Sequence, residues 1–305
     1  MPRILVVYYS QSGDVRRVAE TFVEPLRLSG WEVIWSPIVP RAVYPHPWRN
    51  VHRLFDEMPE CVLGLPPEIS PLGFSPSGHF DLVVLAYPVW FLSPAPPIQA
   101  FFRTEHSRVL HGRKTMTLTV SRNMWQQASL KMKRLLAEAG AVHVDNVAVT
   151  YQGPAWATFI TTPRMLLTGK RDSLWGKLPP PGIAEQDFVR LRSLGESVAR
   201  QLDALACEDG QPLLRGLGAV TVNGRYVIAE WVAARVFVFW AHVIRTLGRI
   251  ARPLRHVGIF LFLHFLLLMI VVGIPSTIIT LPLVYPFVRK RMAAYISQLR
   301  QPTEE

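Results

Sequence analysis

Short apolar runs alternate with amphipathic stretches through the first two thirds of the chain. Runs rich in β-branched residues predict buried parallel strands at residues 4–9, 32–36, 81–87, 115–120 and 142–150. Apolar positions at three- and four-residue intervals predict helices at residues 15–26, 98–105, 126–139 and 185–205. This alternation predicts an α/β domain: a doubly wound, five-stranded parallel sheet with strand order 2-1-3-4-5.

Two segments interrupt this alternation, so the predicted domain at residues 1–206 contains loop insertions at residues 37–78 and 151–182. The first insertion is rich in proline, has one candidate helix at residues 48–57, and carries Tyr44 and Trp48. Disordered segments are poor in aromatic residues, so we expect both insertions to be ordered and to cover a site. The alternative is a surface excursion that packs on the sheet edge.

The remaining residues, 207–305, have a different pattern. Residues 227–250 form a candidate amphipathic helix with basic and aromatic faces, and residues 257–288 form an uncharged run. That run exceeds the roughly 20 residues of a membrane-spanning helix, so it predicts a membrane-associated helical segment. It could cross the membrane once. We favour a hairpin turning near residues 273–276, which keeps both flanking basic clusters on one side.

The charge distribution changes the choice of partner. The net charge is +11, and no Asp or Glu occurs from residue 231 to 303, where arginines flank the apolar run. This pattern favours an anionic membrane surface over nucleic acid. Cys61 and Cys207 form no motif, and the chain enters its first strand without a visible signal peptide. We therefore expect a bacterial-type location on the cytoplasmic face of the inner membrane, anchored by residues 257–288.

The turn after the first predicted strand has the composition of an anion-binding loop. It reads Ser10-Gln11-Ser12-Gly13-Asp14-Val15 and leads directly into a helix. Backbone N–H groups and the helix macrodipole favour an anion there, the hydroxyls add donors, and glycine permits close approach. A phosphate monoester would fit this loop. The alternative is an ordinary strand-to-helix turn.

Two more loops follow predicted strands at the same edge of the sheet. After the third strand come Pro88, Val89, Trp90 and Phe91; after the fourth come Ser121, Arg122, Asn123 and Trp125. Open α/β sheets bind ligands at the carboxyl ends of their strands, so these loops predict contacts to a planar ring. A core-packing role for Trp90 is the alternative.

These motifs resemble those of flavodoxin-like FMN oxidoreductases over about residues 1–205. More narrowly, residues 7–13, 44–48 and 87–94 look like the flavodoxin-like aromatase family of dialkylresorcinol biosynthesis. The resemblance implies bound FMN, possible use of NAD(P)H, a homodimer, and oxidation of a dialkylcyclohexanedione made by a partner ketosynthase. One position departs from the family pattern: Val15 stands where a third hydroxyl residue often closes the phosphate loop.

No metal-ligand spacing and no nucleophile elbow stand out, so we expect the cofactor to supply the chemistry. The aromatic insertions and the membrane segment favour an apolar cyclic substrate, with Tyr9, His79, Tyr87 and Asn123 as candidates to polarise its carbonyls. A base would remove a proton while the flavin takes a hydride. The alternatives are an NAD(P)H:quinone reductase, a membrane-tethered electron carrier and a scaffold without a cofactor.

Overall fold

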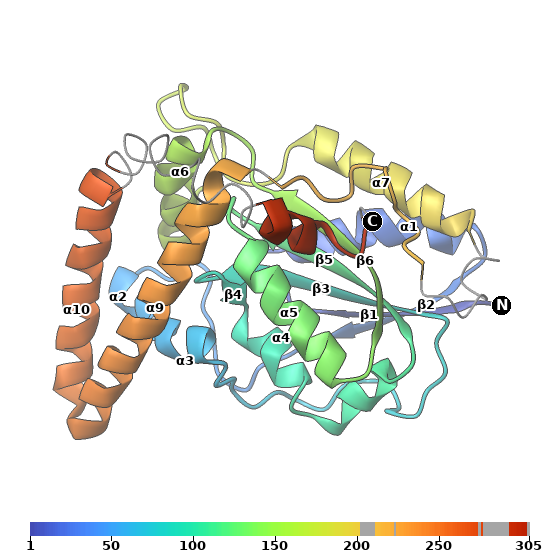
Figure 1. Cartoon of the computed structure of the whole chain (residues 1–305), viewed down its shortest axis with the longest axis horizontal. Helices are drawn as coiled ribbons and strands as arrows, with labels where there is room; N and C mark the ends of the chain where they lie inside the picture. The colour runs from blue at the N-terminus through green and yellow to red at the C-terminus, as the bar shows by residue number, and fades with distance from the viewer. Residues whose placement is uncertain (202–210, 223, 274–275, 277–292, 304–305) are drawn as a thin grey trace.

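A parallel sheet organises the chain. The computed structural model describes residues 1–201, 211–222, 224–273, 276 and 293–303. The sheet has the order β2-β1-β3-β5-β6 (Figure 1). Its parallel strands are β1 (Arg3–Tyr8), β2 (Glu32–Pro37), β3 (Leu82–Trp90), β5 (Lys114–Ser121) and β6 (Val142–Thr150). The short β4 (Ser93–Pro94) pairs antiparallel with the end of β3. This is the flavodoxin-like order 2-1-3-4-5, so the predicted fold class is confirmed.

Helices cover both faces of the sheet. On one face lie α1 (Asp14–Leu28) and α7 (Glu185–Ala199). On the other lie α4 (Pro96–Phe101), the 3₁₀ helix η1 (Glu105–Leu110) and α5 (Gln126–Glu138). Alternate residues of β3 serve the two cores: Val84 packs toward α1, and Leu85 packs toward α4. The continuous apolar run of β3 thus reflects burial on both faces.

A glycine sets the distance between the two helices of the first layer. A Cβ added at Gly195 of α7 would lie 2.1 Å from the backbone oxygen of Phe22 in α1. Only a residue without a side chain therefore permits this approach. The two helices bury their apolar stripes together over the sheet.

Both insertions are built from short helices. The first contains α2 (Val51–Asp56) and α3 (Met58–Leu63), so the single helix predicted at residues 48–57 is wrong in its bounds. Asn50 caps α2 by accepting a hydrogen bond from His52 N at 2.8 Å, and Pro59 favours a new helix start at α3. The second insertion contains α6 (Ala155–Thr168). Trp48 N donates to Leu166 O at 2.8 Å, so the two insertions contact each other.

The apolar tail forms a helical hairpin along one side of the molecule (Figure 1). It comprises α9 (Gly224–Ile250) and α10 (Arg252–Leu268), which ends in a π-helical turn, η2 (Met269–Gly273). The hairpin turns at Ala251, which precedes Pro253 in the first turn of α10. It packs on the first insertion through the core Met58, Ala241, Ile244, Ile259 and Phe262.

This hairpin differs from the expected one. By length and composition, Val227–Ile250 and Arg252–Gly273 could each cross a membrane. The predicted turn near residues 273–276 and the second half of the 257–288 run fall largely on residues 274–275 and 277–292, which lie outside the described residues. The membrane topology therefore stays a prediction.

Other parts of the tail pack on the sheet domain. Leu213 N and Leu214 N donate to the Asp145 carboxylate at 2.7 and 3.3 Å. Asn146 N donates to Thr303 Oγ1 at 2.8 Å. Segments on both sides of the hairpin therefore contact β6, and the tail is not a separate appendage.

Candidate functional site

The loop after β1 has the backbone of an anion site. Gly13 takes a left-handed conformation, φ +91°, just before the first residue of α1. Arg16 N donates to Ser10 Oγ at 3.2 Å, so this hydroxyl caps the helix start. Val15 is buried in the core below the loop and contributes only its backbone to the edge.

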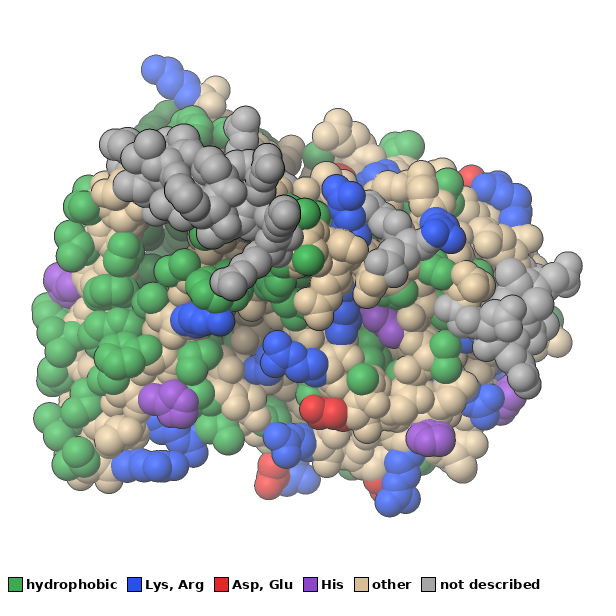
Figure 2. Space-filling model, viewed as in Figure 1, with side chains coloured by type: hydrophobic (Ala, Val, Ile, Leu, Met, Phe, Trp, Pro, Cys, Tyr) green, Lys and Arg blue, Asp and Glu red, His purple; other side chains and the backbone are tan. Residues whose placement is uncertain are grey.

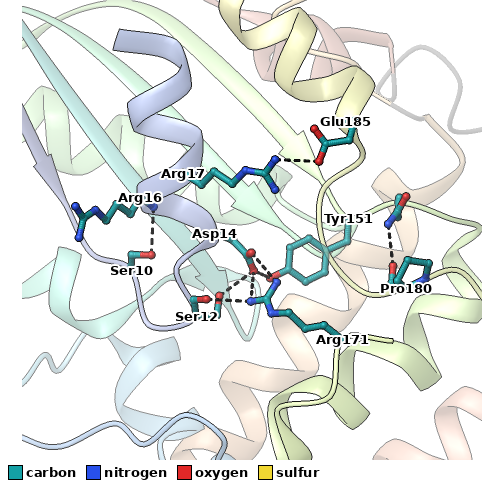
Figure 3. A network of polar contacts seen from close by, with 10 residues as sticks. Ser10, Ser12, Asp14, Arg16, Arg17, Tyr151, Arg171, Pro180 and Glu185 are labelled. Carbon is teal, nitrogen blue, oxygen red and sulfur yellow. Dashed lines mark hydrogen bonds and ion pairs between the residues drawn. The ribbon is translucent and has the colours of Figure 1, made fainter. Parts of the chain in front are cut away.

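A carboxylate at the start of α1 accepts hydrogen bonds from this loop and from the second insertion (Figure 3). Asp14 accepts hydrogen bonds from Ser12 Oγ at 2.9 Å, Tyr151 OH at 2.7 Å and Arg171 Nη1 at 2.8 Å. Burial alone would raise the pKa of Asp14, but the hydrogen bonds from Arg171, Tyr151 and Ser12 outweigh it and hold the pKa below its ordinary value. Ser12 and Arg171 therefore already hold a carboxylate of the chain itself, that of Asp14.

Next to this loop lies a cluster of four aromatic rings. Tyr9 follows β1, Trp90 ends β3, and Tyr44 and Trp48 come from the first insertion. Trp90 contacts the other three rings, with centroid distances of 6.0 Å to Tyr9, 5.3 Å to Tyr44 and 5.9 Å to Trp48. Gln11 Nε2 joins loop and insertion by donating to Pro45 O at 2.8 Å. The first insertion thus covers this edge of the sheet.

The backbone after Trp90 is strained. Phe91 and Leu92 have φ values of +47° and +60°, which non-glycine residues seldom adopt. Phe91 turns away from the aromatic cluster and packs on Phe55, at a centroid distance of 5.4 Å. Strain of this kind concentrates at functional sites, and here it re-aims the chain between β3 and α4.

The loop after β5 is joined to the second insertion. Asn123 Nδ2 donates to Thr158 Oγ1 at 2.8 Å, and the Arg122 guanidinium lies 3.8 Å from the Phe159 ring centroid. Burial lowers the pKa of Arg122 to about 10. No carboxylate pairs with Arg122 among the described residues. Arg122 Nη1 donates only a long hydrogen bond to Thr158 Oγ1, at 3.5 Å, and a desolvated cation without a counter-charge favours an anionic or carbonyl-bearing ligand.

Unsatisfied buried polar atoms also gather at this edge. Within the described residues, His46 Nδ1, Trp48 Nε1, Ser121 Oγ and Thr162 Oγ1 are buried without a hydrogen-bond partner. Buried polar groups are normally paired, so these atoms suit a polar, planar group seated between the insertions and the strand ends. They fit the ring of FMN. At the phosphate end, Asp14 already engages Ser12 Oγ and Arg171, so a phosphate would compete with this carboxylate for both groups.

A carboxyl group of the first insertion acts through its charge on two tyrosines of the aromatic cluster. Glu57 connects α2 and α3, and its carboxylate has no hydrogen bond or ion pair among the described residues. Burial, followed by the charges of Asp56 and Glu60, raises the pKa of Glu57 to about 7. Burial raises the pKa values of Tyr9 and Tyr44, and the charge of Glu57 raises both further. An unpaired carboxyl with this pKa suits proton transfer near neutral pH.

Three predicted site residues are either remote from this edge or buried beneath it. His79 precedes β3 at the opposite edge of the sheet, where its backbone oxygen accepts from Arg3 Nη1 at 3.0 Å. Tyr87 is fully buried and accepts from Thr119 Oγ1 at 2.9 Å inside the sheet. Trp125 is buried with Ala148 and packs against Val89 at the end of β3. His79 is therefore remote from the predicted edge, whereas the roles of Tyr87 and Trp125 stay predictions, with both side chains buried in the structure.

The other predicted residues do lie around this edge. The structure adds residues that the pattern did not single out, chiefly Tyr151, Arg171 and Glu57. Arg171 pairs with Asp14 across 157 positions of sequence, and no local pattern indicates such a contact. Within the described residues, no group of three or more His, Cys, Asp or Glu side chains could hold a metal ion.

No protein-family model and no curated protein matches the chain. Among solved structures it is similar to a proposed flavoprotein of Bacteroides eggerthii, with 21% identity, a TM-score of 0.39, and coverage of 52% of this chain and 94% of that one. It is similar to flavodoxin 1 of Bacillus cereus, with 13% identity, a TM-score of 0.37, and coverage of 66% and 99%.

A protein titled flavone reductase gives 13% identity and a TM-score of 0.38, with coverage of 69% of this chain and 65% of that one. At such low identities and TM-scores, these likenesses carry no argument about activity. The fold assignment rests on the observed strand order.

Proposed function

We propose that this protein is an FMN-dependent oxidoreductase that acts on an apolar cyclic substrate at a membrane surface. One observation carries the proposal. At the carboxyl edge of a flavodoxin-order sheet, the loop after β1 adjoins an aromatic cluster, and buried polar atoms without a hydrogen-bond partner lie in and beside that cluster. Loop, cluster and covering insertions converge where such sheets bind ligands.

Different residues would hold the phosphate and the ring of FMN. Ser12, Gly13 and the N-terminus of α1 would hold the phosphate, with Arg171 as the adjacent cation. Trp90 and the loop after β5 would hold the ring. Bound FMN would supply two-electron chemistry, taking up a hydride from the substrate. The unpaired Arg122 would stabilise negative charge on the ring or on a substrate carbonyl.

The substrate proposal is narrower: a long-chain cyclohexanedione that is oxidised to a resorcinol. Its aromatisation removes one hydride and one proton, followed by tautomerisation. Glu57 would accept the proton from the acidic carbon beside a carbonyl, since its pKa of about 7 leaves part of it ionised at neutral pH. Tyr9 and Tyr44 keep raised pKa values, so they stay protonated and can donate hydrogen bonds to the substrate oxygen.

The membrane part rests on α10. Its outward side carries exposed apolar residues at helical spacing, among them Val257, Phe260, Leu267 and Val271, of which Leu267 is 60% exposed. Figure 2 shows hydrophobic side chains along this side of the molecule. Because α9 packs on α3 and α5, lipid cannot surround it. We therefore place α10 in the interface of an anionic membrane, where an apolar substrate dissolves.

Titration of the purified full-length protein with FMN, followed by flavin fluorescence, tests the proposal. We expect stoichiometric binding and at least tenfold weaker binding by Ser12→Asp, because a second carboxylate would repel the phosphate. Ser77→Asp, on an exposed loop at the opposite edge, is the matched control. Thermal unfolding checks that each variant is folded. FMN binding by Ser12→Asp equal to wild type would contradict the phosphate assignment.

The Asp14 network favours one alternative, a scaffold that binds no cofactor, because Asp14 already engages Ser12 and Arg171, two groups that would hold the phosphate. The same titration decides between them. A folded wild-type protein that takes up no FMN would establish the scaffold and exclude the oxidoreductase. Flavin-bound protein that oxidises NADPH with a soluble quinone, and leaves the dione unchanged, would instead indicate a quinone reductase.

A further inference from the structure

A groove lies on the far side of α5 from the sheet, away from the aromatic cluster. It has a volume of about 590 Å³ and is formed by α5, α9 and the helix at residues 293–300. Small-molecule sites have volumes of roughly 300–1,000 Å³, so the groove is of a size that holds a ligand. It contributes nothing to the proposed redox site.

One side of the groove is apolar. Leu130 of α5 and Trp231, Ala234 and Val238 of α9 line it, and the α9 residues recur at helical spacing on one face. Trp231 and Val238 remain 42% and 41% exposed, so the wall of the groove presents apolar surface to solvent. An apolar chain laid along this wall would bury surface that the protein itself leaves open.

The rim of the groove is cationic. Lys133, Arg134 and Arg235 line it, and no Asp or Glu does. Within the described residues neither arginine forms an ion pair, and the Arg235 guanidinium lies 3.2 Å from the Trp231 ring centroid. The nearby Glu230 is fully buried and accepts from Gln127 N at 2.7 Å. Lys133 is already engaged with Gln298 O at 2.9 Å, which leaves the two arginines for a ligand.

Figure 2 shows Lys and Arg side chains on this face, beside the hydrophobic side of the hairpin. We propose that the groove binds a free long-chain carboxylate, with its chain on the α9 wall and its head group between Arg134 and Arg235. The guanidinium groups match a carboxylate in charge and in hydrogen-bond geometry. The site shares α9 with the hairpin, so a ligand that partitions into the membrane can reach it. The proposal does not depend on FMN binding.

Photocrosslinking of the full-length protein tests this site. The probe is a C18 fatty acid with a diazirine in its chain, used below its micelle concentration, and adducts are mapped by peptide mass spectrometry. We expect adducts at residues 127–137 and 231–238. Labelling there should fall at least fivefold in Arg134→Gln/Arg235→Gln. The corresponding diazirine alcohol should label at least fivefold less than the acid.

Two further variants separate the site from general effects. Ala234→Phe keeps both charges and fills the groove, so it should also reduce labelling at least fivefold. Arg245→Gln/Arg249→Gln, on α9 outside the groove, removes two arginine charges as the double variant does and should leave labelling within twofold of wild type. Thermal unfolding confirms that each variant is folded.

Several outcomes would overturn the proposal. Adducts confined to α10 would show that the probe only follows exposed apolar surface. Equal labelling by acid and alcohol, or unchanged labelling in Arg134→Gln/Arg235→Gln, would exclude carboxylate recognition. Competition by phosphatidylglycerol as effective as by oleate would assign the groove to a lipid head group in place of a free carboxylate.

Discussion

The sheet domain and the α9–α10 hairpin differ in how far they bury their apolar residues. The sheet buries both faces of β3 beneath helices, and its strand residues Leu82 to Tyr87 are fully buried. The hairpin buries one stripe against α3 and leaves the outward side of α10 exposed, with Val271 at 62%. An apolar surface of this kind is stable in water only when another apolar phase or partner covers it. The sheet is covered on both faces, in part by the tail residues Leu213 and Leu214, whereas the outward side of the hairpin is left uncovered.

The largest expected effect concerns the fully buried helix packing of the sheet domain. Gly195→Ala places a methyl group 2.1 Å from Phe22 O and forces α7 away from α1. Overpacking of this kind should lower the free energy of unfolding by about 3 kcal/mol. Chemical denaturation monitored by circular dichroism measures it. Gly73→Ala, where a Cβ meets nothing within 4 Å, is the control and should change stability little.

The second prediction concerns the exposed apolar side of α10. Leu267→Glu puts a charge on the exposed apolar stripe and should weaken sedimentation with phosphatidylglycerol vesicles about 10- to 100-fold. The loss corresponds to the roughly 1.5–3 kcal/mol gained by burying one leucine side chain. Val189→Glu replaces an equally exposed apolar residue on α7 and should bind vesicles as wild type does. Equal binding by Leu267→Glu would show that α10 does not contact the membrane.

The junction between the two regions depends on one arginine. Arg255 of α10 pairs with Asp56 at 2.5 Å and with Glu60 at 2.8 Å, and its side chain is 20% exposed. Arg255→Gln leaves both carboxylates without this partner, so we expect a loss of about 1–2 kcal/mol, less than for a fully buried pair. Thermal unfolding measures the loss, and protease cleavage near residue 251 should increase.

Arg252→Gln is the matched control for the junction. Arg252 lies one helical turn earlier on α10, is exposed, and forms no ion pair among the described residues. It should unfold within about 0.5 kcal/mol of wild type, as surface substitutions usually do. An equal effect of the two variants would show that helix charge, and not the pairing with the insertion, stabilises the hairpin.

The smallest expected effect concerns pH. The pKa of Glu57 is about 7 in the folded protein against an ordinary value of 4.5, so folding favours the protonated carboxyl. The resulting stabilisation is complete below about pH 4.5 and is lost as pH rises through about 7. Glu57→Gln should remove this pH dependence. Because Glu57 is partly exposed, the difference in unfolding free energy between pH 5 and 8 should change by less than about 1 kcal/mol.

The two regions also differ in how far the sequence predicts them. The strands and the strand order follow from periodicity, because a strand buried on both faces must be continuously apolar. The position of His79 was predictable too, since a residue that precedes a parallel strand lies at the amino edge, far from the site. The burial of Tyr87 and Trp125 required the structure, because an aromatic residue beside a strand end can face either a ligand or the core.

The sequence by itself determined the α/β order, the loop from Ser10 to Val15 and the apolar character of the tail, because local periodicity and turn chemistry encode them. Only the tertiary structure decided that Arg171 and Tyr151 close on Asp14, that the charge of Glu57 acts on the tyrosines, and that the hairpin turns at Ala251. These features depend on contacts between residues far apart in sequence. Packing selects such contacts among many that local patterns permit equally.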